Sequence, residues 1–110
     1  MRMWMVSPEL MCRNHLLGEH VELHMLAGCI QRGKNINGFL EKGLVDPSLI
    51  HSRHEELVRE MERRGYRHQS PIAEIGFPAS GACLDPQANL NELSSRCPVC
   101  RSIIKASKEK

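Results

Sequence analysis

The sequence contains no apolar run close to the roughly 18 residues that a membrane-spanning helix needs. The apolar stretch at its start, Met1 to Val6, is interrupted by Arg2 and is followed at once by Ser7-Pro8-Glu9, so it is too short for a signal peptide. We therefore expect a cytoplasmic protein that has no membrane partner.

The chain also lacks a strand pattern, a large excess of charge and an even number of cysteines. No hairpin signal, internal repeat or low-complexity stretch is present, which together with the helical periodicities predicts an all-α fold. The net charge is only +2, so a nucleic-acid partner is permitted, but any basic surface must come from local clustering. Five cysteines argue against a complete disulfide framework and for reduced thiols or metal binding.

A chain of 110 residues is long enough for one domain with one modest core. Its longest helical pattern covers Arg13 to Arg32, where apolar side chains occupy most of the circumference, as is typical of a central helix. Gly33 is suited to end this helix in a left-handed conformation. The apolar positions are Leu16, Leu23, Leu26, Ala27 and Ile30 on one side and Val21, Met25 and Cys29 on another.

Two further helices are predicted from N-cap and proline signals. Asp46-Pro47-Ser48 starts a helix that runs to Arg64, with Gly65 as its stop, and Asp85-Pro86 opens a weaker helix over 87–95. The apolar stripe of the first of these consists of Ile50, His54, Leu57, Val58 and Met61.

Shorter elements complete the predicted organisation. Helical turns are expected from Ser7 and within residues 36–43, and an extended loop is expected over 69–83. We expect a small helical domain over residues 1–95 and a cysteine-containing C-terminal tail over residues 96–110 whose lysine-rich end is frayed.

The central helix carries a polar stripe of His15, Glu19 and Glu22, spaced i, i+4, i+7. Two carboxylates at the edge of a buried face are costly unless they are paired or useful, and the alternative is a solvated rim. Periodicity leaves both interpretations open. His20 and His24 have a spacing that could bind a metal, but no HExxH motif is present, and surface histidines are the favoured interpretation.

Cys97-Pro98-Val99-Cys100 forms a CxxC knuckle near the end of the chain. Cys97 and Cys100 would supply two zinc ligands at the right spacing, whereas a structural zinc site needs four. Cys83 is a candidate for the third ligand, and a histidine would complete the set. A free dithiol, or a knuckle completed by another chain, is the alternative.

Four arginines cluster at the end of the second helix, namely Arg59, Arg63, Arg64 and Arg67. A solvated helix end is the more common explanation, because positive charge there also suits the helix dipole. The functional alternative is a patch that contacts phosphates.

Two stretches of the chain form an ordered set of motifs. The first is His15-Leu16-Leu17-Gly18-Glu19-His20-Val21-Glu22-Leu23, followed by Gly28 and Gly33-Lys34. The second runs from Glu56 to Tyr66 and ends in Arg63-Arg64-Gly65-Tyr66. In their order and spacing these stretches resemble the pyrimidine-dimer DNA glycosylase family, and the resemblance covers residues 1–72.

The resemblance implies a glycosylase and abasic-site lyase that acts on double-stranded DNA containing UV-induced pyrimidine dimers. In this family the α-amine attacks the sugar C1′, an imine forms, and β-elimination breaks the strand. The family's essential glutamate falls on Glu22, its N-terminal arginine on Arg2 and its central-helix histidine on His15. We expect Met1 to be retained before the large Arg2, so the amine of Met1 would be the nucleophile.

An α-amine suits this role, because its unperturbed pKa is near 8 and a useful fraction is neutral at physiological pH. The implied catalysis requires no cofactor, although a structural zinc is compatible with it. A monomer is the favoured oligomeric state.

The chain departs from the family where two arginines that flank the essential glutamate are replaced by Val21 and Met25. Other basic residues would have to supply the missing phosphate or substrate contacts, and the candidates are Arg32, Lys34, Arg63 and Arg64. The replacement favours a second hypothesis, a non-catalytic DNA-binding or regulatory module on the same fold. A third hypothesis is a metal-dependent hydrolase that uses His20, His24 and Glu19, for which the ligand geometry is poorest.

Overall fold

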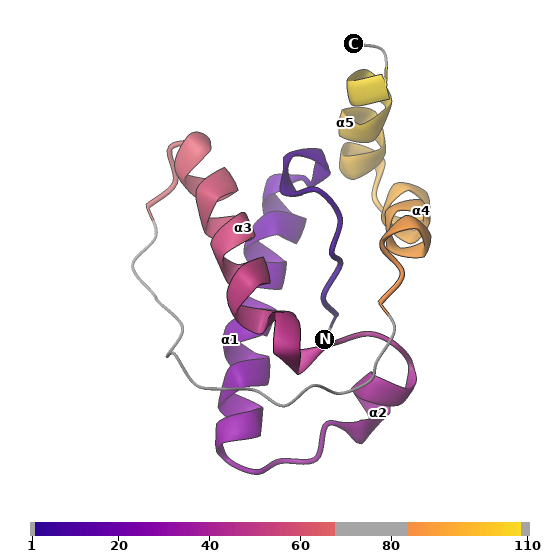
Figure 1. Cartoon of the computed structure of the whole chain (residues 1–110). Coiled ribbons are helices and arrows are strands. Elements are labelled where there is room, and N and C mark those ends of the chain that lie inside the picture. Colours follow the sequence, from indigo (N-terminus) through magenta and orange to yellow (C-terminus); the bar gives the residue numbers. More distant parts are fainter. Residues whose placement is uncertain (1, 68–83, 109–110) are drawn as a thin grey trace.

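The computed structural model describes residues 2–67 and 84–108, and all regular structure within these residues is helical (Figure 1). The all-α prediction is confirmed. The elements in chain order are the 3-10 helix η1 (Pro8–Leu10), α1 (Arg13–Gln31), α2 (Asn37–Glu41), the 3-10 helix η2 (Pro47–Leu49), α3 (Ile50–Arg63), α4 (Pro86–Arg96) and α5 (Pro98–Lys108). None of the helices in these two ranges has the length and apolar character needed to cross a bilayer.

The core forms mainly where α1 packs against α3 (Figure 1). The apolar stripe predicted on α3 is buried, and so are the α1 positions Leu16, Leu23 and Leu26. The second apolar side of α1 is not covered in the same way, because Val21 and Met25 remain 55% and 54% exposed. The helix is therefore central to the fold but presents two apolar side chains on its outer surface.

Both long helices end at the predicted glycines. Gly33 follows α1 with φ +69°, and Gly65 follows α3 with φ +84°. Glycine adopts this left-handed region at little steric cost, whereas a residue with a Cβ atom does so at a penalty. The predicted loop over 69–83 lies outside the described residues.

The segment before η1 is buried and lies beside α1 (Figure 1). Met3, Trp4 and Val6 are each no more than 5% exposed, and the N–H of Met3 donates to the Leu44 carbonyl at 2.8 Å. From α4, the Asn89 side chain donates to the Trp4 carbonyl at 2.8 Å. These contacts hold the start of the chain in a fixed path across the fold.

The prediction of a frayed C-terminal end is wrong, because residues 98–108 form α5. Pro98 is suited to the first helical turn, and Lys105 and Lys108 in the last turn complement the helix dipole. Cys100 and Ile104, one turn apart, are buried. Burial of this face, which the spacing of the apolar residues indicates, gives α5 its tertiary support.

Candidate active site

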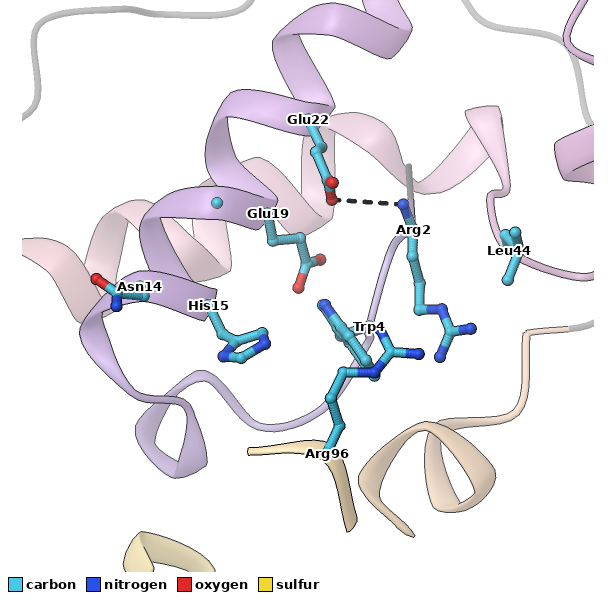
Figure 2. Close-up of a pocket in the computed structure, with 9 residues that line it drawn as sticks. Arg2, Trp4, Asn14, His15, Glu19, Glu22, Leu44 and Arg96 are labelled. Atoms are coloured by element: carbon cyan, nitrogen blue, oxygen red, sulfur yellow. Dashed lines mark hydrogen bonds between the residues drawn. The ribbon is translucent and has the colours of Figure 1, made fainter. Parts of the chain in front are cut away.

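A cavity of about 300 Å³ lies where the N-terminal segment, α1 and α4 meet (Figure 2). The N-terminal segment contributes Arg2 and Trp4 to its lining. The lining also includes His15, Glu19 and Glu22 from α1, and Arg96 from the end of α4. The structure thus brings Arg2, His15 and Glu22, which were predicted as site residues, together around one cavity.

Glu22 lies next to the start of the chain. Its Oε2 atom accepts a hydrogen bond from the backbone N–H of Arg2 at 3.4 Å, across 20 residues of sequence (Figure 2). The carboxylate is half-buried and borders the cavity. Met1, the predicted nucleophile, lies outside the described residues, and Arg2 follows it directly in the chain.

Glu19 is fully buried, so the solvated-rim interpretation is wrong for this residue. Arg53 of α3 donates two hydrogen bonds to its carboxylate, from Nε at 2.6 Å and from Nη2 at 2.8 Å. Burial raises the pKa of Glu19, while the Arg53 guanidinium opposes that rise. The pair joins α1 to α3 directly beneath the cavity.

Two guanidinium groups lie close to the Trp4 ring at the cavity. The guanidinium carbon of Arg2 lies 4.6 Å from the Trp4 ring centroid, and that of Arg96 lies 5.6 Å from it. The His15 ring meets Trp4 edge-on, with 5.8 Å between the centroids. Sequence reasoning missed Arg96 and Trp4, because no motif marks them and Arg96 is distant from α1 in the chain.

The other predicted DNA-binding residues lie away from this cavity. Arg63 and Arg64 both pair with Glu60. Their hydrogen bonds lower the pKa of the Glu60 carboxyl, and the bond from Arg63 has the larger effect. Arg64 also donates to the carbonyl oxygen of Met11 at 2.7 Å, so it helps to fix η1 against α3. Arg32 and Lys34 are exposed beyond the C-terminal end of α1.

A second cluster brings together Cys12, His15, Cys97 and Cys100. One possible ligand atom from each lies within 4.8 Å of the others, and the cluster could hold a metal ion. The backbone N–H of Cys100 lowers the pKa of Cys97, whereas burial raises the pKa of Cys100 to about 12. Cys83, the earlier candidate for a third ligand, lies outside the described residues.

The interpretation of His20 and His24 as surface histidines is wrong. His20 is 8% exposed and His24 is half-buried, and both meet His54 of α3, with ring centroids 4.9 and 5.2 Å from that of His54. Their ligand atoms could also hold a metal. Sequence analysis assigned His54 to the apolar stripe, so its approach to a pair on another helix was not expected.

The cavity thus combines the Glu22 carboxylate next to the start of the chain with two guanidinium groups that lie near one aromatic ring. A family model described as pyrimidine dimer DNA glycosylase matches residues 1–74. The chain therefore belongs to this family, as its sequence resemblance predicted. Neither the curated proteins nor the solved structures yielded a match.

Proposed function

We propose that the protein is a DNA glycosylase and abasic-site lyase that acts on UV-induced pyrimidine dimers through its N-terminal amine. The observation that carries the proposal is the 3.4 Å hydrogen bond from the Arg2 N–H to Glu22. It links the family's glutamate to the residue that follows Met1 in the chain. A neutral α-amine beside this carboxylate would act as the nucleophile, and the carboxylate would transfer protons.

In the proposed reaction, the lone pair of the neutral Met1 amine forms a bond to C1′ of the 5′ nucleotide of the dimer. The bond between C1′ and the base nitrogen breaks, and the base keeps that electron pair. Loss of a proton from the nitrogen leaves a neutral aminal at C1′. The nitrogen lone pair then forms the C=N bond of an iminium while the C1′–O4′ bond breaks and O4′ takes up a proton, which opens the sugar ring. Glu22 accepts a proton from C2′, and the electron pair that this releases expels the 3′ phosphate oxygen. This β-elimination cleaves the strand and requires no cofactor.

The remaining cavity residues would bind and orient the DNA. Arg2 offers its guanidinium group to phosphate oxygens, and Arg96 would do so beyond its existing pairing with Glu92. The His15 ring offers a further polar group beside Trp4. Arg32 lies ten residues beyond Glu22, about 15 Å along the axis of α1, and Lys34 follows the end of this helix, so both would reach flanking phosphates. Arg63 and Arg64 would contact DNA only beyond their existing pairing with Glu60.

One observation favours a second candidate, a non-catalytic DNA-binding module. Val21 and Met25 take the place of family arginines, and both are more than half exposed on α1 beside Glu22. Arg96 offers a compensating charge from a region outside the matched residues 1–74. The two candidates differ in whether a covalent intermediate forms on DNA.

Borohydride trapping separates the two candidates. Untagged protein mixed with DNA that contains either a pyrimidine dimer or an abasic site should form an imine, which borohydride reduces to a stable adduct. Peptide mapping should place this adduct on the amine of residue 1. The DNA that yields the adduct identifies the lesion.

The matched control for trapping is the same chain with a short N-terminal extension, in which the amine of Met1 becomes an amide. This protein should give no adduct although it remains folded by circular dichroism. An adduct on a lysine in both proteins would replace Met1 as the nucleophile. Folded, untagged protein that binds DNA but gives no adduct would favour the binding module.

Replacing Arg96 with glutamine should lower the affinity for lesion-containing DNA. It should also make this affinity less dependent on salt concentration. If Arg96 contacts one phosphate, the slope of log affinity against log salt concentration should fall by about 0.9. The control is Arg101→Gln, which removes an equal charge from a guanidinium that donates to the carbonyls of Ser94 and Ser95. Fluorescence anisotropy with labelled duplex measures both. An unchanged slope in Arg96→Gln would exclude this phosphate contact.

A further inference from the structure

We propose that Cys12, His15, Cys97 and Cys100 bind a structural zinc ion. This ion would hold the C-terminal helices α4 and α5 against the start of α1. Three thiolates and one imidazole form a Cys₃His set, one of the ligand combinations of structural zinc sites. The knuckle supplies two of these ligands, and the N-terminus of α1 supplies the other two. Neither the proposed reaction nor residues 1–74 of the family match account for Cys97 and Cys100.

The distances within the cluster fit one tetrahedral ion. Zinc–sulfur bonds of about 2.3 Å place two thiolates roughly 3.8 Å apart, and a thiolate about 3.5 Å from an imidazole nitrogen. The Sγ atoms of Cys12 and Cys97 are 3.9 Å apart. The His15 Nδ1 atom lies 3.2 Å from Cys12 Sγ and 3.6 Å from Cys100 Sγ. The side chains therefore need only small adjustments to accept the ion.

Backbone groups also support thiolates at this site. The N–H of Cys12 donates to Cys100 Sγ at 3.2 Å, and the N–H of Cys100 donates to Cys97 Sγ at 3.5 Å. Hydrogen bonds from backbone amides stabilise the negative charge on metal-bound sulfur. Cys12 and Cys100 are buried, and Cys97 is half-buried, so the ion would be shielded from solvent.

Zinc binding would leave the cluster with a single negative charge. Three thiols release three protons when they bind Zn²⁺, so three thiolates and one ion leave a net charge of −1. The neutral His15 adds no charge. If its Nδ1 atom binds zinc, its proton must reside on Nε2, so the ring that borders the cavity becomes a fixed hydrogen-bond donor.

The position of the cluster defines what the ion does. Cys12 directly precedes α1, and Cys97 stands between α4 and α5. Arg96, which borders the candidate active site, is the neighbour of Cys97 in the chain. A zinc ion here would therefore fix the position of Arg96 and of the two C-terminal helices relative to α1.

The cluster of His20, His24 and His54 is the alternative place for a metal. It offers three imidazoles and no thiolate, a set that is more common in catalytic zinc sites with an open position. The two clusters have different ligand types, so they can be distinguished by spectroscopy as well as by substitution.

The test is the metal content of the untagged full-length protein, prepared under reducing conditions with added zinc. Wild-type protein should contain one zinc per chain, and Cys97→Ser should lose it. The matched controls are Cys29→Ser, which removes a free cysteine elsewhere on α1, and His24→Asn in the other cluster. Both controls should keep the ion.

Cobalt(II) in place of zinc makes the result independent of how the variants fold. Wild-type protein with bound cobalt should show tetrahedral ligand-field bands and intense thiolate-to-cobalt charge transfer. Chelation of zinc from wild-type protein should lower its thermal midpoint. No bound metal, a cobalt spectrum without thiolate bands, zinc loss only in His24→Asn, or a Cys97–Cys100 disulfide in the reduced preparation would each overturn the proposal.

Discussion

Replacing Glu22 with glutamine should abolish strand cleavage at pyrimidine-dimer and abasic sites while the protein remains folded. Glutamine keeps the oxygen that accepts the hydrogen bond from the Arg2 N–H, so the half-buried side chain loses little packing. It cannot accept the C2′ proton in the proposed reaction. Removal of a general base typically slows a reaction by about 10²- to 10⁴-fold.

Single-turnover cleavage of a labelled duplex measures this effect, and anisotropy measures binding of the same duplex. Glu22→Gln should bind DNA at least as well as wild type, because the substitution removes a negative charge near phosphates. The control is Glu62→Gln on the exposed surface of α3, which should cleave at the wild-type rate. Wild-type cleavage by Glu22→Gln would remove this carboxylate from the mechanism.

Replacing Arg53 with methionine should destabilise the fold by about 3–5 kcal/mol, as is usual when one partner of a buried ion pair is removed. Arg53 and Glu19 are both fully buried, and the substitution leaves the Glu19 carboxylate without its principal partner. Urea denaturation of the variant and wild type measures the loss. The double variant Glu19→Gln/Arg53→Met also removes the negative charge of the buried Glu19 carboxylate, so it should recover much of the stability.

The loss in Arg53→Met should become smaller at low pH. Burial raises the pKa of Glu19 above its ordinary value in the folded state. The folded state therefore binds a proton more readily than the unfolded state, so stability is highest below the unfolded pKa and falls as pH rises through the folded pKa. Arg53→Met strengthens this trend by removing the opposing guanidinium. An equal loss at pH 4 and pH 8, together with an equally unstable double variant, would show that lost packing, and not charge, dominates.

The helical layout was readable from the sequence because local signals define most of it. Pro8, Asp46 and Asp85-Pro86 mark helix starts, and Gly33 and Gly65 mark helix ends, all within one turn of the observed positions. The resemblance around Glu22 likewise identified a residue of the cavity. The end of the chain also carries local signals for α5, namely Pro98 in the first turn and the apolar residues Cys100, Ile103 and Ile104 on one side, but these were not used when a frayed end was predicted.

The parts of the site that were missed depend on contacts between distant residues. Cys12 and Cys97 are separated by 85 positions, so the knuckle alone gave no reason to choose Cys12 over Cys83. A C-x-x-H spacing from Cys12 to His15 was the available signal. His54 was assigned to an apolar stripe because periodicity identifies a buried face but not the polar group that meets it there.

The buried N-terminal segment affects when the site can form during synthesis. Met3 and Trp4 leave the ribosome among the first residues, but the side chain that holds their carbonyls belongs to Asn89. Met5, in the left-handed region with φ +55°, also needs surrounding contacts to hold its backbone. The N–H of Met3 can pair with the Leu44 carbonyl as soon as that residue is available, whereas the Trp4 carbonyl gains its partner only when Asn89 of α4 has been made. A nascent chain that stops before α4 would lack the Asn89 contacts, so the segment beside Glu22 would be held by fewer hydrogen bonds than in the complete fold.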